Sequence, residues 1–485
     1  MSSYSVAQNT SFLTAASILQ KAVSFIYFTV IARVVGVENT GQYFFAITFT
    51  TIFTVVADFG LGPVLTRETA KYPENTEKYV NTVFWTKLLF GGLSYLLVLL
   101  FSNLLHYSPE TKLLIYLSGI TMLFDTMQTT FYSIFRARKN LIYEAIGVVG
   151  VQTLTLIIGT LALLRGLPLY WLILAYTIPS FINLMYVSFF VRRVYQFRYR
   201  FAFDRSIGKT FLTLAIPFAF AGILSRLYSS ADSILMSKML TQEHLGWWSV
   251  PYKITFAFQF IPIALSASVY PVMSALSIGD TSKISELFGK AWRYLAIIVF
   301  PLAGGLFAVA RPAITTIYGA SYAPSVTVLH ILLISLIFGY FSFLTGALLN
   351  ATNHQKHQMM VMGAALVANL ILNWFLLPQI DIQGAAIATL VGNTILFVGG
   401  YYFSSRFVRL NHRNNFLIAV RAFFPAVLMS LVVYFTTHYM HFMIAIPIGI
   451  GVYAVLLFLF GGMTKELLYE FKNKIFVKET NTTEV

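Results

Sequence analysis

Residues 17–44 read SILQKAVSFIYFTVIARVVGVENTGQYF, and residues 222–249 read GILSRLYSSADSILMSKMLTQEHLGWWS. In each stretch a lone cation, Lys21 or Arg226, precedes the pattern Glu-x-x-Gly-x-aromatic. The cations and the motifs are separated by the same offset, since 226 − 21 = 205. This correspondence predicts an internal repeat whose equivalent first helices each carry one cation.

The composition indicates a polytopic membrane protein. The chain has 485 residues, of which 58% are hydrophobic and 11% charged, whereas a soluble domain carries roughly 25% charged residues. Cysteine is absent, which excludes disulfides and thiolate metal sites. The polar residues 1–10 lack the basic region of a cleaved signal peptide, so we expect the first helix to be retained.

About 20 apolar residues span a bilayer as a helix, and about fourteen segments of this kind follow one another. The predicted fold is therefore all-α, with about 14 transmembrane helices. The segments are 11–33, 41–63, 80–104, 113–135, 141–164, 168–191, 210–239, 247–277, 292–311, 325–350, 357–378, 383–404, 416–437 and 442–462.

Basic residues alternate across these segments. With the N-terminus inside, the inside loops and the tail hold about 23 of the 33 lysines and arginines, and the outside loops hold about five. This asymmetry predicts cytoplasmic N- and C-termini. It also explains most of the net charge of +15, so we do not expect nucleic-acid binding.

The repeat predicts two lobes of six helices with the same orientation, related by an axis along the membrane normal. Two further helices follow the second lobe. The predicted boundaries are 1–191 for the N-terminal lobe, 192–209 for a basic cytoplasmic linker, 210–404 for the C-terminal lobe, 405–462 for helices 13 and 14, and 463–485 for a cytoplasmic tail.

Several charges fall inside predicted spans, where one charge at mid-bilayer costs roughly 2.5–3.5 kcal/mol on insertion scales. Cations near the midplane predict a water-filled cavity that binds an anion. The predicted substrate-binding cations are Lys21, Arg226, Lys87 and Lys253. The predicted ion-coupling or gating carboxylates are Asp125, Asp232 and Asp58.

A structural alternative is that each cation pairs with a nearby carboxylate and holds helices together. Asp125 is one potential partner for Lys21 or Lys87. A direct pair between Arg226 and Asp232 is disfavoured, because six residues rotate the two side chains to different helix faces.

Enzyme signatures are absent from the sequence. There is no GxxxxGK[ST], HExxH or GxSxG motif, and the acidic residues are few and scattered. We therefore expect no catalytic residues, no metal and no cofactor.

The chain resembles the polysaccharide transporter family of the multidrug/oligosaccharidyl-lipid/polysaccharide superfamily. The resemblance rests on the fourteen spans, the arrangement of six, six and two helices, and several loose motifs in the expected order. These motifs are Ala32-Arg33-x-x-Gly36 with Glu38-x-x-Gly41-x-Tyr43, Ala57-Asp58-Phe59-Gly60-Leu61-Gly62 with Thr66-Arg67-Glu68-x-Ala70, and Ile317-Tyr318-Gly319-x-x-Tyr322-x-x-Ser325.

The resemblance implies an inner-membrane flippase for O-antigen or exopolysaccharide assembly. Its substrate would be an oligosaccharide on a polyprenyl pyrophosphate, moved to the outer leaflet by alternating access. Membrane lipids, a polysaccharide polymerase and a chain-length regulator would be its partners. A lipid II flippase, a multidrug extrusion antiporter and a non-transporting scaffold remain alternatives. Twelve-span antiporters of the superfamily bind cationic drugs with carboxylates, which fits the cationic midplane less well.

Overall fold

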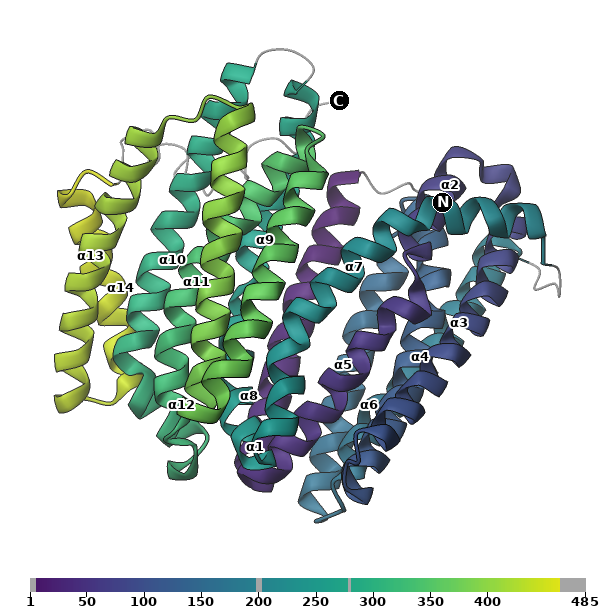
Figure 1. The fold of residues 1–485 in the computed structure, drawn as a ribbon, viewed down its shortest axis with the longest axis horizontal. Coiled ribbons are helices and arrows are strands. Elements are labelled where there is room, and N and C mark those ends of the chain that lie inside the picture. Colours follow the sequence, from purple (N-terminus) through teal and green to yellow (C-terminus); the bar gives the residue numbers. More distant parts are fainter. Residues whose placement is uncertain (1–5, 198–202, 278–280, 463–485) are drawn as a thin grey trace, which may run out of the picture. The chain divides into compact units, whose positions relative to one another are not determined.

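The computed structural model describes residues 6–197, 203–277 and 281–462, and every regular element within them is helical (Figure 1). The elements in chain order are α1 (Val6–Asp58), α2 (Leu61–Lys71), η1 (Pro73–Asn75), α3 (Thr76–Leu104), α4 (Pro109–Ala137), α5 (Ile142–Leu164), α6 (Tyr170–Tyr195), α7 (Arg205–Met239), α8 (Gln242–Phe258), α9 (Phe260–Leu276), α10 (Thr281–Ile317), η2 (Ala320–Tyr322), α11 (Ser325–Ala351), α12 (Gln355–Phe407), α13 (His412–Tyr439) and α14 (Phe442–Leu459).

Two of these elements each contain two spans. Gly36 (φ 81°) breaks α1, and Asp381 (φ 50°) breaks α12, so the chain reverses inside both. Eleven stretches of the described residues are long and apolar enough to cross a membrane. Two of the eleven contain these breaks, and α4 adds a further helix of 29 residues. The predicted all-α polytopic fold is confirmed, and the helices agree with the fourteen predicted segments.

The contacts divide the chain into two compact units. Unit 1 comprises Met1–Ala257 and Met362–Ala388, and unit 2 comprises Phe258–Val361 and Thr389–Val485. The repeat-based lobes are a different grouping of the same helices and stay a prediction. The tail 463–485 and residues 198–202 of the predicted linker lie outside the described residues.

Unit 1 has an apolar core at the end where α2 packs against α4 and α7. Leu61 and Leu65 of α2, Phe135 of α4 and Phe211 of α7 are buried together there. The opposite face of α2 carries Arg67 and other polar residues, as expected of a short amphipathic helix. α7 contains Pro217 and bends along its length (Figure 1), and it contacts α1, α2 and α3.

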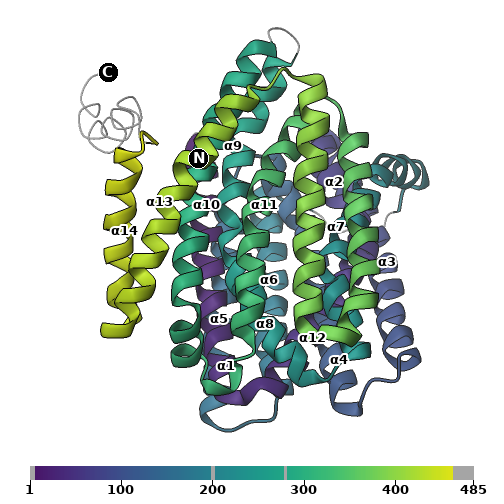
Figure 2. The ribbon, with the colours of Figure 1, turned by 60° about the vertical axis from the view of Figure 1, so that its left-hand side comes forward.

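Unit 2 is built around α10, which packs against α9, α11 and α13. α10 and α13 approach closely at Gly304, where an added Cβ would lie 2.3 Å from the Ser430 hydroxyl oxygen. From this crossing the two helices diverge toward Ile317 and Tyr439 (Figure 2). α14 packs mainly on α13.

Candidate functional site

The two repeated motifs meet in unit 1, where the second half of α1 packs against the start of α8. A Cβ on Gly41 would lie 1.9 Å from the Gln242 carbonyl oxygen, and a Cβ on Gly246 would lie 2.1 Å from the Val37 carbonyl oxygen. Both distances are far below van der Waals contact, so glycine alone permits this approach of the two backbones. The motif glycines thus hold α1 and α8 in register.

Two of the predicted cations face aromatic rings across this pair of helices. The Nζ atom of Lys21 in α1 lies 5.6 Å from the ring centroid of Phe256 in α8. The Nζ atom of Lys253 in α8 lies 5.4 Å from the ring centroid of Phe28 and 6.0 Å from that of Phe44, both in α1. Cation–π attraction acts within about 6 Å and compensates part of the lost hydration.

Arg226 reaches the same region from α7. The helix that carries Arg226 contacts α1. The Tyr252 ring packs edge-on against Phe44 at 5.5 Å and parallel to Phe256 at 5.9 Å. Tyr252 therefore lies among the aromatic rings beside the two lysines.

We refer to Lys21, Lys253 and Arg226 as the three-cation site. Arg226 is exposed, and the two lysines are half-buried. Among the residues that the structure describes, none of the three forms an ion pair with a carboxylate. A charge inside a membrane needs a partner or water. Because these three cations lack a carboxylate partner, the site favours binding of an anion.

The fourth predicted cation, Lys87 of α3, has a different environment. Its side chain is fully buried, and its Nζ atom lies 2.5 Å from Asp58 Oδ1 at the end of α1. Nζ also donates to the hydroxyl group of Thr129 at 3.1 Å and to the carbonyl oxygen of Thr126 at 3.5 Å, both in α4. Lys87 is thus a paired cation that joins α1, α3 and α4, which is the structural alternative described above.

Asp58 is followed by a strained connection between α1 and α2. Phe59 (φ 46°) and Gly60 (φ 71°) both adopt left-handed backbone conformations. A Cβ on Gly60 would lie 2.9 Å from the Ala215 carbonyl oxygen of α7. The Lys87–Asp58 pair therefore anchors the chain directly before a tight turn that α7 covers.

Asp125 of α4 contacts neither Lys21 nor Lys87. Its carboxylate accepts hydrogen bonds from Ser180 at 2.6 Å, Gln128 at 2.8 Å and Tyr176 at 3.4 Å. Three donors satisfy this half-buried carboxylate without a cation, so its local role is to connect α4 and α6.

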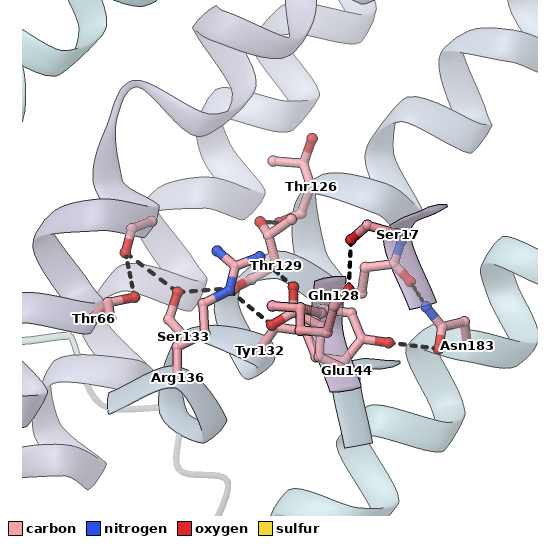
Figure 3. Close-up of polar contacts among 12 residues, drawn as sticks. Ser17, Thr66, Thr126, Gln128, Thr129, Tyr132, Ser133, Arg136, Glu144 and Asn183 are labelled. Atoms are coloured by element: carbon pink, nitrogen blue, oxygen red, sulfur yellow. Dashed lines mark hydrogen bonds and ion pairs between the residues drawn. The ribbon is translucent and has the colours of Figure 1, made fainter. Parts of the chain in front are cut away.

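The polar network continues along α4 toward α5 (Figure 3). Gln128 accepts from the Asn183 amide, and Asn183 accepts from the Tyr132 hydroxyl at 2.8 Å. One turn further on, Arg136 pairs with Glu144 of α5. The face of α4 that turns toward α5 and α6 is therefore polar and internally satisfied.

Asp232 of α7 is buried beside two amides of α12. Its Oδ1 atom accepts from Asn373 at 2.7 Å and from Asn369 at 3.0 Å, and no ion pair joins it to Arg226 among the described residues. The carbonyl oxygen of the Asn373 side chain is buried without a hydrogen-bond partner. The groups that face the carboxylate are therefore the amide nitrogens of Asn369 and Asn373. The described residues contain no cluster of three His, Asp or Glu suited to a metal ion.

The aromatic residues of the site were not identified from the sequence. Phe28, Phe44, Tyr252 and Phe256 are four of the 73 Phe and Tyr residues in the chain, and most such residues face lipid or pack between helices. The spacing of Tyr252 and Phe256, four residues apart and flanking Lys253, places them on one helix face and was the only available signal.

Comparison with known proteins agrees with the predicted family. The family model described as "Polysaccharide biosynthesis protein" matches residues 6–277, which is more than half of the chain, and the MatE model matches residues 217–375. The teichuronic acid biosynthesis protein TuaB of Bacillus subtilis is 24% identical over 291 residues, which is 59% of this chain and 58% of TuaB. The probable flippase AglR of Haloferax volcanii is 27% identical over 35% of this chain and 36% of its own length.

Some curated relatives are matched over nearly their full length. The capsular polysaccharide biosynthesis protein CapF of Staphylococcus aureus is 22% identical over 82% of this chain and 99% of CapF. The first two relatives are each matched over less than two thirds of their length. Sequence similarity is therefore broad but low.

Solved structures give the same fold. The lipid II flippase MurJ, in an inward closed conformation, has a TM-score of 0.76 at 18% identity and covers 96% of this chain and 99% of MurJ. An inward-facing multidrug resistance transporter of the MATE family has a TM-score of 0.67 at 13% identity and covers 80% of this chain. By their titles, these two neighbours are a flippase and a transporter. The chain belongs to the polysaccharide biosynthesis protein family.

Proposed function

We propose that this protein is a flippase that moves an oligosaccharide linked to polyprenyl pyrophosphate from the cytoplasmic to the outer leaflet of the cell membrane. The observation that carries the proposal is the three-cation site. Lys21 and Lys253 lie on the packed helices α1 and α8, Arg226 lies on α7, which contacts α1, and none of the three forms an ion pair with a carboxylate among the described residues. The family and the names of TuaB and CapF support a glycan substrate, and the name of AglR supports a flippase.

The chemistry of this substrate fits the site in two ways. A pyrophosphate carries several negative charges that hydrocarbon does not stabilise, and ammonium and guanidinium groups bind phosphate oxygens through charge-assisted hydrogen bonds. Sugars present apolar ring faces that pack on aromatic side chains, of which Phe256 and Tyr252 lie next to the cations. The polyprenyl chain requires no polar contact and remains in lipid.

Movement of the substrate requires the site to open to each side in turn. In this proposal the contact between Gly41 and Gly246 closes the predicted outer side, because it joins the two loops predicted to be external. Release of this contact, accompanied by bending of α7 at Pro217, would expose the cations to the outer leaflet.

Asp232 is the carboxylate that we propose for ion coupling. It is buried in α7 and accepts hydrogen bonds from the amides of Asn369 and Asn373 in α12, so a change in its protonation would alter the contact between these two helices. Asp125 and Asp58 are satisfied by local partners, so we assign them positioning roles. After transfer, a polymerase and a chain-length regulator would use the exposed substrate.

Leaflet exchange in proteoliposomes tests this function. A polyprenyl-pyrophosphate oligosaccharide is reconstituted with the protein, and its accessibility to an external sugar-modifying enzyme is followed over time. Protein-dependent exposure of the sugar is expected. Exposure of lipid II alone would assign the chain to the lipid II flippases, and efflux of an organic cation without sugar exposure would assign it to the multidrug antiporters.

Substitution of Gly246 by alanine tests the closing contact. The added methyl group would overlap the Val37 carbonyl oxygen, which lies 2.1 Å from the position of the Cβ, so α1 and α8 must separate at a cost of about 1–3 kcal/mol. Cysteine cross-linking or reagent accessibility across this contact should then show a larger open fraction. Gly92, whose Cβ would meet nothing within 4 Å, provides the control variant Gly92→Ala. Equal accessibility in the two variants would contradict the proposal that the contact between Gly41 and Gly246 closes the outer side.

A further inference from the structure

A groove in unit 2 is lined by none of the residues of the three-cation site. It is formed by α10, α11 and α13 and has a volume of about 920 Å³, which is near the upper end of the range for ligand pockets, about 300–1,000 Å³. It arises because α10 and α13 touch at Gly304 and Ser430 and then diverge (Figure 2). Its floor is therefore the close crossing of the two helices.

Most of the groove wall is apolar, but its polar groups gather at one end. Ala303, Val427 and Leu431 line the part nearest the helix crossing. Arg311 lies less than two turns before the end of α10, and His438 lies one residue before the end of α13. This end of unit 2 is predicted to lie in the outer leaflet.

Arg311 is the permanent cation of this polar end. It is exposed, and it forms no ion pair within the described ranges. His330 Nε2 donates to the Phe307 carbonyl oxygen at 3.1 Å while its ring stacks on the Phe307 ring at 3.9 Å. His438 Nδ1 donates to the Tyr434 carbonyl oxygen at 3.0 Å. In its neutral form each imidazole has thus used its only N–H, and Arg311 remains as the main donor.

We propose that this groove binds one anionic phospholipid of the outer leaflet, with a phosphodiester headgroup on Arg311 and an acyl chain along the apolar wall. The charge complementarity selects this occupant. One guanidinium matches the single negative charge of a phosphodiester, whereas a pyrophosphate would call for several cations, as at the three-cation site. Arginine is also the side chain whose planar fork fits two phosphate oxygens at once.

The lipid joins three helices that otherwise separate toward this end. Its chain fills the space between α10 and α13, and its headgroup connects Arg311 with the start of α11. Because a ligand that binds only the folded state stabilises it by mass action, the lipid should strengthen the packing of α13 on unit 2. The inference does not rest on the transport function.

Native mass spectrometry of the purified full-length protein tests the proposal. Phosphatidylglycerol should bind at lower concentration than phosphatidylcholine, and Arg311→Gln should weaken the phosphatidylglycerol complex about tenfold, as expected for loss of a hydrogen bond to a charged group. The matched control is Arg165→Gln, an exposed arginine at the end of α5 in unit 1, which should leave binding unchanged.

A photoactivatable phosphatidylglycerol with a mid-chain diazirine locates the site. Cross-links are expected on peptides that contain residues 303–312 and 427–438, and Ala308→Trp should abolish them by filling the groove. Equal loss of binding in Arg311→Gln and Arg165→Gln would overturn the proposal, as would cross-links spread evenly over the lipid-facing helices. Displacement of the bound lipid by equimolar polyprenyl phosphate would assign the groove to the carrier instead.

Discussion

Lys87 and the cations of the three-cation site are the same kind of residue in the same kind of helix, yet they have opposite surroundings. Lys87 is fully buried, with Asp58 at 2.5 Å and two further acceptors in α4. Lys21 and Lys253 have only aromatic rings at 5.4–6.0 Å, and Arg226 is exposed. A cation inside a membrane span therefore indicates a binding function only when no carboxylate compensates its charge.

The largest expected effect is on stability, at the paired cation. Lys87→Met leaves Asp58 without its partner, and removal of one member of a buried pair costs about 3–5 kcal/mol. Because Asp58 keeps 32% of its side chain exposed, we expect a loss of about 3 kcal/mol, near the lower end of that range. The free energy of unfolding in mixed micelles measures this loss.

The double variant Lys87→Met/Asp58→Leu is the control for this prediction. An apolar replacement of both partners removes the unpaired charge, so the double variant should be more stable than Lys87→Met alone. A Lys87→Met protein as stable as the wild type would contradict the structural role and return Lys87 to the candidate substrate-binding cations.

A smaller effect, on transport and not on stability, is expected at the unpaired cations. Arg226→Ala removes one charge-assisted hydrogen bond to the phosphate and should slow leaflet exchange about tenfold. Its free energy of unfolding should change by less than about 0.5 kcal/mol, as for an exposed side chain. Arg226→Lys should keep part of the activity, because it retains the charge but not the fork of donors. Loss of stability without loss of exchange per folded molecule would contradict this role.

The smallest effect is expected at the aromatic ring over Lys21. A double-mutant cycle with Lys21→Met and Phe256→Leu should give a coupling energy of about 0.5–1 kcal/mol in unfolding experiments. The equivalent cycle for Lys87 and Asp58 should give a clearly larger value. If the two couplings were equal, the distinction between paired and unpaired cations would fail.

The sequence predicted the fold better than the surroundings of the charges. Hydropathy and basic loops indicate each helix independently, and the breaks at Gly36 and between the halves of α12 fall in predicted loops. The repeated motif indicated that Gly41 and Gly246 occupy equivalent positions in the two halves of the chain. That Gly41 and Gly246 touch each other is a property of helix packing, which a pattern along one helix does not contain.

The site was predicted in part for the same reason. Depth in the membrane identified Lys21, Arg226 and Lys253, which form no ion pair among the described residues, but it grouped the paired Lys87 with them. Depth does not reveal which helix is the neighbour, and so it did not pair Lys87 with Asp58 or Asp232 with Asn369 and Asn373. Whether these residues act in transport stays a prediction.

The most direct measurement compares leaflet exchange, per folded molecule, in two double variants that each remove two charges. Lys21→Ala/Arg226→Ala empties most of the three-cation site, and Lys87→Met/Asp58→Leu removes the buried pair. The first variant should fold like the wild type and lose leaflet exchange. The second should retain most of its leaflet exchange per folded molecule. Normal exchange by a well-folded Lys21→Ala/Arg226→Ala protein would contradict the central claim that these cations bind the substrate.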